Sequence, residues 1–562
     1  MRRLSLAVPL LSLLVLVLLA AAAPAAAFRI VEFCPDTYLP RDADAYFVLG
    51  GNGSLAGLNI TDGEGFIAFP RGASAGGRVT VADEGLAFQE THGILPDFEL
   101  KNTTAAVPDM VKTGRYAPAN DGDELDLSVD GRVVQSIRWP GDFQPREGQV
   151  HVLADGGWDP RALLLGQSQF LPRTFGNATV TGFVSPDSSY GVLESAITGA
   201  RQEILVNAYE LSHPGIGDLL VAARRRGVAV RVLLEGGPVG GISPGEEAVC
   251  AAINGSGIPL EMMTSTASSH ARYRYDHAKY LVIDGRALLV STENFGVTGF
   301  PLPGSRGNRG WGALIEDQGV AGYFGEVFSA DAAGGDVIPY TPPPKAISPS
   351  SPASYPAKFA PLHVTGVIVT PVLAPDTSGE ILALLGRAHD RIDIEQASIR
   401  NSSRYGLDPY LAAAVNASRH GVAVRVLLDG SPYNDEGPAD NNEMVDLVNG
   451  IARQEGLPLT ARILDPEAGG LVTVHTKGAI VDGGSVLISS INWNSNSPNF
   501  NREAGVILES PALASYYTGV FDADWDLAEA GPGPIGPDIA KLAIAGLVVL
   551  ALLLVLLVKR RR

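Results

Sequence analysis

An internal duplication constrains the fold of this chain more than any other feature of its sequence. The octamer Gly-Val-Ala-Val-Arg-Val-Leu-Leu occurs at 227–234 and again at 421–428. Each copy follows a stretch that favours a helix and precedes an acidic residue and a glycine. Strand, helix and strand in this order, with apolar β-branched strands, are typical of an α/β fold with a largely buried sheet. The duplication therefore predicts two similar α/β/α halves, over 160–337 and 363–528.

The segments between and before these halves have a different character. Residues 338–362 contain eight prolines, which predicts an extended linker. Residues 28–145 contain short apolar runs separated by Gly, Asn, Asp and Pro, without a sustained helical period. This pattern predicts a small all-β sandwich in front of the first half.

The beginning of the chain predicts export. Residues 1–27 combine two early arginines, an apolar core and small residues before Phe28, which is the pattern of a secretory signal peptide. An uncleaved anchor is the alternative interpretation.

The other end predicts membrane attachment. Residues 539–558 are apolar apart from Lys541 and are long enough to cross a bilayer, and a basic cluster follows at 559–562. Because such clusters stay in the cytoplasm, we expect a single-pass protein of the cell membrane whose main body is extracellular. A buried core helix and a lipid-replaced tail are the alternatives for this run.

Charge and cysteine content exclude several classes of site. Between residues 28 and 538, 35 basic side chains face 61 acidic ones. A body this acidic repels polyphosphates at long range, which disfavours general nucleic-acid binding. The two cysteines, Cys34 and Cys250, exclude a disulfide-dense fold and a Cys-rich metal site. We expect no metal and no cofactor.

A repeated His-x-Lys motif carries the chemistry predicted for the two halves. His277 and Lys279 in the first half match His475 and Lys477 in the second. If each motif lies on a strand, alternation places its imidazole and ammonium on one face, about 7 Å apart. Two such pairs suit a phosphodiester, because lysines hold its oxygens while two imidazoles divide the roles of nucleophile and acid.

Matched polar residues accompany both motifs. Asp284 and Asp482 lie five residues after the lysines and directly before a glycine, which favours a structural role in a turn. A hydroxyl and an amide side chain follow each histidine by 15 and 17 residues; we expect the two to share a strand face and to bind substrate. They are Thr292 and Asn294 in the first half and Ser490 and Asn492 in the second. By the same alternation, Glu293 is expected to point away from the site.

With these residues the sequence resembles the phospholipase D superfamily. Its H-x-K-x(4)-D signature occurs at 277–284 and at 475–482, each followed by a small polar residue and an asparagine, and the resemblance covers 160–528. It implies a two-step reaction within one chain and without a metal. One histidine attacks phosphorus, and the other protonates the leaving alcohol and then activates water or an acceptor alcohol.

The resemblance also implies a function. We expect a membrane-anchored extracellular phosphodiesterase that acts on phospholipid head groups. The alternatives are a nuclease, a phosphatidyl-transferase similar to cardiolipin synthase, and a surface-binding protein whose catalytic halves are inactive.

The two copies differ at one informative position, where Glu503 corresponds to Gly310. In relatives, a carboxylate near this point orients the imidazole of the opposite half, and an imidazole so oriented is the better nucleophile. The resemblance therefore favours His277 as nucleophile and His475 as general acid, with the reverse assignment open. Glu316 or Asp317 is the candidate substitute for the carboxylate that the first half lacks. The candidate sources of local positive potential are Arg272, Arg274, Arg306 and Arg309, with solvated loop charges as the alternative.

The N-terminal segment resembles a lamin-tail domain, which is an immunoglobulin-like sandwich. The matching pieces are Ile30–Glu32, Ala45–Leu49, the turn at 121–124 with the strand at 125–129, and Val133–Ile137. This resemblance implies a binding or spacing module rather than a second catalytic domain.

Overall fold

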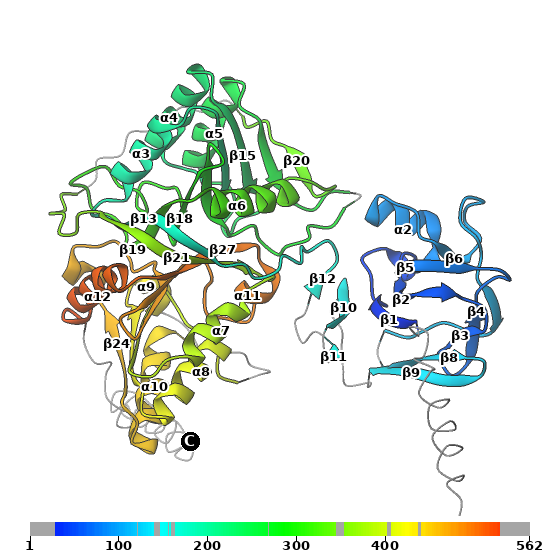
Figure 1. The fold of residues 1–562 in the computed structure, drawn as a ribbon. Coiled ribbons are helices and arrows are strands. Elements are labelled where there is room, and N and C mark those ends of the chain that lie inside the picture. The colour runs from blue at the N-terminus through cyan, green and yellow to red at the C-terminus, as the bar shows by residue number, and fades with distance from the viewer. Residues whose placement is uncertain are drawn as a thin grey trace, which may run out of the picture. The chain divides into compact units, whose positions relative to one another are not determined.

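The computed structural model divides the chain into two compact units (Figure 1). Unit 1 comprises Met1–Gln167 and Ser265–Arg272, and unit 2 comprises Ser168–Thr264 and Tyr273–Arg562. The described residues are 28–120, 122–139, 147–154, 157–158, 163–267, 269–343, 353–401, 406–435 and 440–528.

Several predicted segments lie outside these residues, namely the signal peptide, the membrane helix, the basic tail and the middle of the linker. Within the described ranges, no helix is both long and apolar enough to span a membrane.

Unit 1 contains the predicted N-terminal β region as two sheets that share one core. One sheet has the order β11-β10-β1-β2-β5-β6, with β12 paired to β10, and the other has the order β7-β4-β3-β8-β9. Ile30 and Leu49 from the first sheet pack with Ile60 and Leu127 from the second. The first sheet continues past the predicted boundary at 145, because β10 pairs with β1. The resemblance to a lamin-tail domain stays a prediction.

The elements of unit 1 have the following bounds: β1 Arg29–Cys34, β2 Tyr46–Ser54, β3 Leu58–Thr61, β4 Gly65–Ala68, β5 Ser74–Glu84, α2 Gly85–His92, β6 Phe98–Lys101, β7 Val111–Gly114, β8 Asp123–Val129, β9 Arg132–Trp139, β10 Gln149–Ala154, β11 Gly157–Trp158 and β12 Leu163–Leu164.

Unit 2 repeats one series of elements twice, as the duplication predicted. The first series is β13 Phe175–Ser185, α3 Ser189–Gly199, β14 Glu203–Ala208, α4 Pro214–Arg225, β15 Ala229–Glu235, α5 Pro244–Gly255, β16 Leu260–Met263, β17 Lys279–Ile283, β18 Ala287–Ser291, β19 Gly310–Glu316 and α6 Gln318–Asp331. The second is β21 Leu362–Ala374, α7 Gly379–Gly386, β22 Arg391–Gln396, α8 Pro409–Arg419, β23 Ala423–Asp429, α10 Asn441–Glu455, β24 Leu459–Leu464, β25 Lys477–Val481, β26 Ser485–Ser489, β27 Glu503–Glu509 and α12 Pro511–Trp525. Three short elements are added to these series: β20 Val337–Pro339, α9 Pro432–Asp435 and α11 Ser497–Phe500.

The strands of both halves form one 15-stranded sheet. Its order is β20-β16-β15-β14-β17-β18-β19-β13-β21-β27-β26-β25-β22-β23-β24, so the halves join where β13 pairs antiparallel with β21. In each half three strands run parallel and a fourth, the one that begins at the motif lysine, pairs antiparallel to them. The carboxyl ends of the parallel strands and the start of the motif strand therefore lie at one edge of the sheet.

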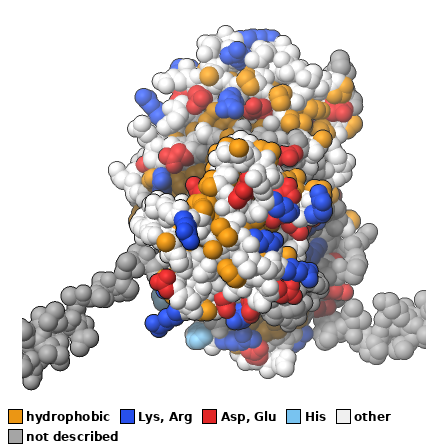
Figure 2. Space-filling model, turned by 90° about the vertical axis from the view of Figure 1, so that its right-hand side faces the viewer, with side chains coloured by type: hydrophobic (Ala, Val, Ile, Leu, Met, Phe, Trp, Pro, Cys, Tyr) orange, Lys and Arg blue, Asp and Glu red, His pale blue; other side chains and the backbone are white. Residues whose placement is uncertain are grey.

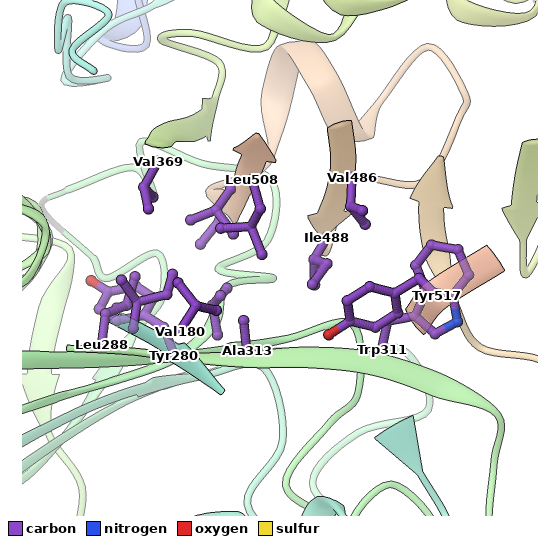
Figure 3. Packing of buried hydrophobic residues seen from close by; sticks show 14 of the residues in the cluster. Val180, Tyr280, Leu288, Trp311, Ala313, Val369, Val486, Ile488, Leu508 and Tyr517 are labelled. Atoms are coloured by element: carbon purple, nitrogen blue, oxygen red, sulfur yellow. The ribbon is translucent and has the colours of Figure 1, made fainter. Parts of the chain in front are cut away.

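Three cores hold this sheet in an α/β/α arrangement. The repeated octamer shows why, since Val230 and Val232 pack with α3, α4 and α5 while Leu233 points into the core on the other face of the sheet. The second half has its own core under α7, α8 and α10. The third core lies between the halves and combines residues such as Tyr280 and Trp311 with Ile488 and Tyr517 (Figure 3).

Candidate active site

The two motifs meet because each pairs its backbone with the opposite half. The His277 N–H donates to the carbonyl of Arg502 at 2.8 Å, and the His475 N–H donates to the carbonyl of Arg309 at 2.8 Å. We predicted that each strand begins at its histidine, but β17 and β25 begin at the lysines. The two histidines precede these strands, at the junction between the halves.

Two buried arginines hold this junction together. The Arg502 guanidinium contacts Asp376 of its own half at 2.8 Å and Asp331 on α6 of the other half at 2.9 Å. Arg309 repeats the arrangement with Asp187 at 2.8 Å and Asp524 on α12 at 2.6 Å. The suggestion that Arg309 supplies positive potential to substrate was therefore wrong, because its charge is buried and paired.

A carboxylate contacts each histidine from the opposite half. His277 Nδ1 lies 2.8 Å from Glu503 Oε2, as the resemblance implied. The other carboxylate oxygen accepts a hydrogen bond from Asn501 Nδ2 at 2.9 Å and another from Ser497. These contacts hold the Glu503 carboxylate in place, and the Glu503 side chain is fully buried.

The second carboxylate is Glu293, which we had expected to point away from the site. Its Oε2 lies 3.4 Å from His475 Nδ1 and accepts a hydrogen bond from Asn308 Nδ2 at 2.8 Å. The expectation failed because β18 ends at Ser291, so strand alternation does not extend to residue 293. The two candidate substitutes lie elsewhere: Asp317 caps α6 and Glu316 is exposed at the far end of β19.

The motif lysines are buried beside the histidines. Lys279 Nζ donates to the carbonyl of His277 at 2.7 Å, and Lys477 Nζ donates to that of His475 at 2.7 Å. Burial lowers the pKa of Lys279 to about 7 and that of Lys477 to about 8. Glu503 raises the pKa of Lys279 while the charge of Lys477 lowers it, so the two pairs act on each other electrostatically.

Burial lowers the pKa of both histidines, and His277 is neutral near pH 7. Burial lowers the pKa of His277 to about 4, with Glu503 opposing the shift and Lys279 adding to it. The pKa of His475 is lowered as well, first by burial and then by Lys477, while Glu293 opposes the shift. A neutral imidazole whose Nδ1 faces a carboxylate presents its other nitrogen, Nε2, as a nucleophile.

The predicted substrate-binding residues divide into two kinds. Thr292 and Ser490 are fully buried, and each hydroxyl accepts a backbone N–H of the next strand, from Trp311 at 3.1 Å and from Ala504 at 3.0 Å. The amide side chains belong to half-buried residues: Asn294 Nδ2 lies 3.5 Å from Glu210 Oε2, and Asn492 follows β26 at the same edge. The hydroxyls thus hold the loops, while substrate binding by the amides stays a prediction.

The two motif aspartates lie at the opposite end of their strands. Asp284 accepts the backbone N–H groups of 201–203, and Asp482 accepts those of 389–391. Both aspartates have positive φ angles, 52° and 50°, in the turns before the glycines. They connect a loop to the end of a strand and do not reach the histidines.

Sequence reasoning missed one aromatic neighbour of the site. The Tyr209 ring meets the His277 ring edge to face at 4.6 Å between centroids, and Lys279 Nζ lies 5.1 Å from its centre. Tyr209 directly follows β14, at the carboxyl end of a buried parallel strand, and that position was the available signal.

Replacing Lys279 by methionine should abolish catalysis and yet stabilise the fold. Folding lowers the pKa of this lysine, so the protonated side chain destabilises the folded state relative to the unfolded state. This destabilisation is fully present below about pH 7. It fades as the pH rises towards the pKa of the unfolded chain, near about 10. We expect K279M to raise the free energy of unfolding at pH 6 by about 2–4 kcal/mol, with the gain shrinking by pH 10. Urea unfolding at both pH values measures it.

Lys101 is the matched control, because Asp83 raises the pKa of this exposed lysine. K101M should leave stability nearly unchanged or slightly reduce it. A loss of stability in K279M at pH 6 would contradict the prediction.

No cluster of three or more His, Cys, Asp or Glu side chains is arranged to hold a metal ion within the described part of the chain. The expectation of a metal-free reaction stays a prediction.

Comparisons with known proteins found one family and several similar proteins. The family described as "Cardiolipin synthase, PLD-like domain" matches residues 193–332 and 381–525. A probable phospholipase D of Caenorhabditis elegans is 33% identical over 129 residues, which is 23% of this chain and 22% of that protein. The chain thus spans about a fifth of that relative.

Solved structures resemble the fold more distantly. Phosphatidylserine synthase of Haemophilus influenzae matches 62% of this chain and 87% of its own, at 13% identity and a TM-score of 0.46. Nuc, a phospholipase D family member of Salmonella typhimurium, matches 30% of this chain and 99% of its own, at 23% identity and a TM-score of 0.25. Because the family match falls on both halves of unit 2 and spans half of the chain, this protein belongs to the phospholipase D superfamily, in the family of PLD-like domains described for cardiolipin synthase.

Proposed function

We propose that this protein is a membrane-anchored extracellular phosphodiesterase of phospholipase D type that cleaves phospholipid head groups. One observation carries the proposal: two His-Lys pairs meet at the junction of the halves, and each imidazole faces a buried carboxylate from the opposite half. The export signal and the membrane helix rest on the sequence of 1–27 and 539–558.

In the first step, Nε2 of His277 attacks phosphorus and the bond to the head-group alcohol breaks. The leaving oxygen takes the Nε2 proton of His475, which starts as the imidazolium and becomes neutral, while Glu503 stabilises the positive charge that develops on His277. In the second step, His475 removes a proton from water, whose oxygen attacks phosphorus and breaks the phosphorus–nitrogen bond. We assign His277 as nucleophile because its carboxylate contact of 2.8 Å is the shorter of the two.

The loops around the site favour lipid over nucleic acid. No charged residue occurs in the segments 236–243, 294–305, 468–474 and 490–501. The exposed Arg274, whose guanidinium donates to Asn496 at 3.0 Å, is a basic side chain beside them. Three valines on these loops are exposed: Val239 by 67%, Val297 by 40% and Val472 by 41%. A polyanion would need many lysines and arginines here. Separately, on the one face of the molecule that Figure 2 draws, basic side chains are interspersed with acidic ones.

The test is turnover by the full-length chain in mixed micelles. We expect release of the head group from phosphatidylcholine or phosphatidylglycerol, and cleavage of bis-p-nitrophenyl phosphate. Excess single-stranded or duplex DNA should neither inhibit nor be cut. Failure to cleave any diester would refute the enzyme, faster cleavage of DNA would favour the nuclease, and transfer to added glycerol in preference to water would favour the transferase.

A further inference from the structure

The glutamate beside the motif stands at different matched positions in the two halves. Position 310, at the start of β19, holds glycine where β27 starts with Glu503. Position 293, two residues after β18, holds glutamate where Ile491 stands two residues after β26. Each half therefore has one carboxylate, but at a different one of the two positions.

The two positions of the first half compete for the same space. A Cβ atom added to Gly310 would lie 2.3 Å from Glu293 Oε1 and 2.4 Å from its Cγ. The φ angle of Gly310 lies outside the left-handed region, so its backbone does not require glycine. Room for the Glu293 side chain is the physical reason for the glycine.

Both carboxylates nevertheless arrive at equivalent places. Each is at most 1% exposed, and each accepts a hydrogen bond from the asparagine of its own half's Asn-Arg segment, Asn308 at 2.8 Å or Asn501 at 2.9 Å. From there each reaches Nδ1 of a histidine in the opposite half. Different positions in the chain thus deliver the same group to the same kind of partner.

We infer that Glu293 is the positioning residue of His475, in the role that Glu503 has for His277. A carboxylate at Nδ1 keeps the proton on that nitrogen and leaves Nε2 facing the substrate. Its charge also stabilises the imidazolium that must donate the proton to the leaving group. The inference rests on the proposed function and explains how the first half stays competent without a glutamate at position 310.

The experiment moves the carboxylate from one position to the other. We expect E293I and E293Q to reduce kcat on phosphatidylcholine by about 100-fold or more, because each removes the carboxylate that orients a catalytic imidazole. G310E alone should also lose activity, because its side chain meets Glu293. The double variant E293I/G310E carries the glutamate where the second half has it, and should recover at least about tenfold over E293I, a coupling that double-mutant cycles detect.

A spectroscopic readout separates this inference from the proposed function. In nitrogen-15 spectra of histidine-labelled protein, His475 should show its proton on Nδ1 in the wild type and in E293I/G310E, but not in E293I. Glu316 lies at the exposed end of β19, the strand that begins at Gly310. E316Q is therefore the matched control and should change neither kcat nor the His475 tautomer. If the wild type shows no turnover, the proposed function is refuted. If E293I keeps the wild-type tautomer and kcat, the role of Glu293 is overturned. A double variant no more active than E293I would also overturn it.

Discussion

His277→Asn should abolish both turnover and the covalent intermediate, whereas His475→Asn should still form the intermediate and then stall. His277 has the shorter carboxylate contact, and its imidazole is neutral at pH 7 because burial lowers its pKa to about 4. Without it no phosphorus–nitrogen bond forms, so we expect a loss of at least about 10⁴-fold. His475 acts on the leaving group and on water, so its loss spares the first step when the leaving group needs no proton.

Bis-p-nitrophenyl phosphate supplies such a leaving group. H475N should release about one p-nitrophenolate per active site in a rapid burst, followed by very slow turnover, and the phosphorylated protein should be recovered after an alkaline quench. H277N should show no burst. His420 is the matched control, since it is exposed and its Nδ1 lies 2.8 Å from the carbonyl of Asn416 on its own helix, and H420N should behave as the wild type. A burst in H277N but not in H475N would reverse the two roles.

The sequence predicted the parts of this site that repeat. The His-Lys pairs were found because both copies keep the same spacing, and Glu503 followed from the aligned Asn-Arg segments. Glu293 was misplaced because strand alternation was extended past Ser291, where β18 ends. The available signal was that the first half has Glu293 where the matched segment of the second half has Ile491.

Contacts between distant parts of the chain were beyond the sequence. Asp331 and Asp524 lie 171 and 215 residues from the arginines that they bind. Nothing in a local pattern distinguishes such an arginine from a surface one, so Arg309 was taken for a source of positive potential at the site. The same limit applies to β10, whose pairing with β1 extends the sandwich beyond its predicted end.

Replacing Arg502 by methionine should strongly destabilise unit 2. The guanidinium is fully buried and forms ion pairs with Asp331 and Asp376. In R502M these two buried carboxylates would lose the cation that they bind. Breaking a buried ion pair by removing one partner typically costs about 3–5 kcal/mol. Arg419 is the matched control, because it forms an ion pair with Glu455 at the surface, and R419M should leave stability nearly unchanged.

The pH dependence and a compensating variant identify the cause of this loss. Carboxylates stripped of their cation have raised pKa values, so R502M should lose less stability as the pH falls and they become protonated. R502M/D331N/D376N, which neutralises both, should recover part of the loss at pH 7, as urea unfolding followed by tryptophan fluorescence would show. Because the backbone of Arg502 holds His277 and precedes Glu503, R502M should also lose activity at temperatures where it is folded. A stability loss as small as that of R419M, or no recovery in the triple variant, would mean that packing rather than charge joins the two halves.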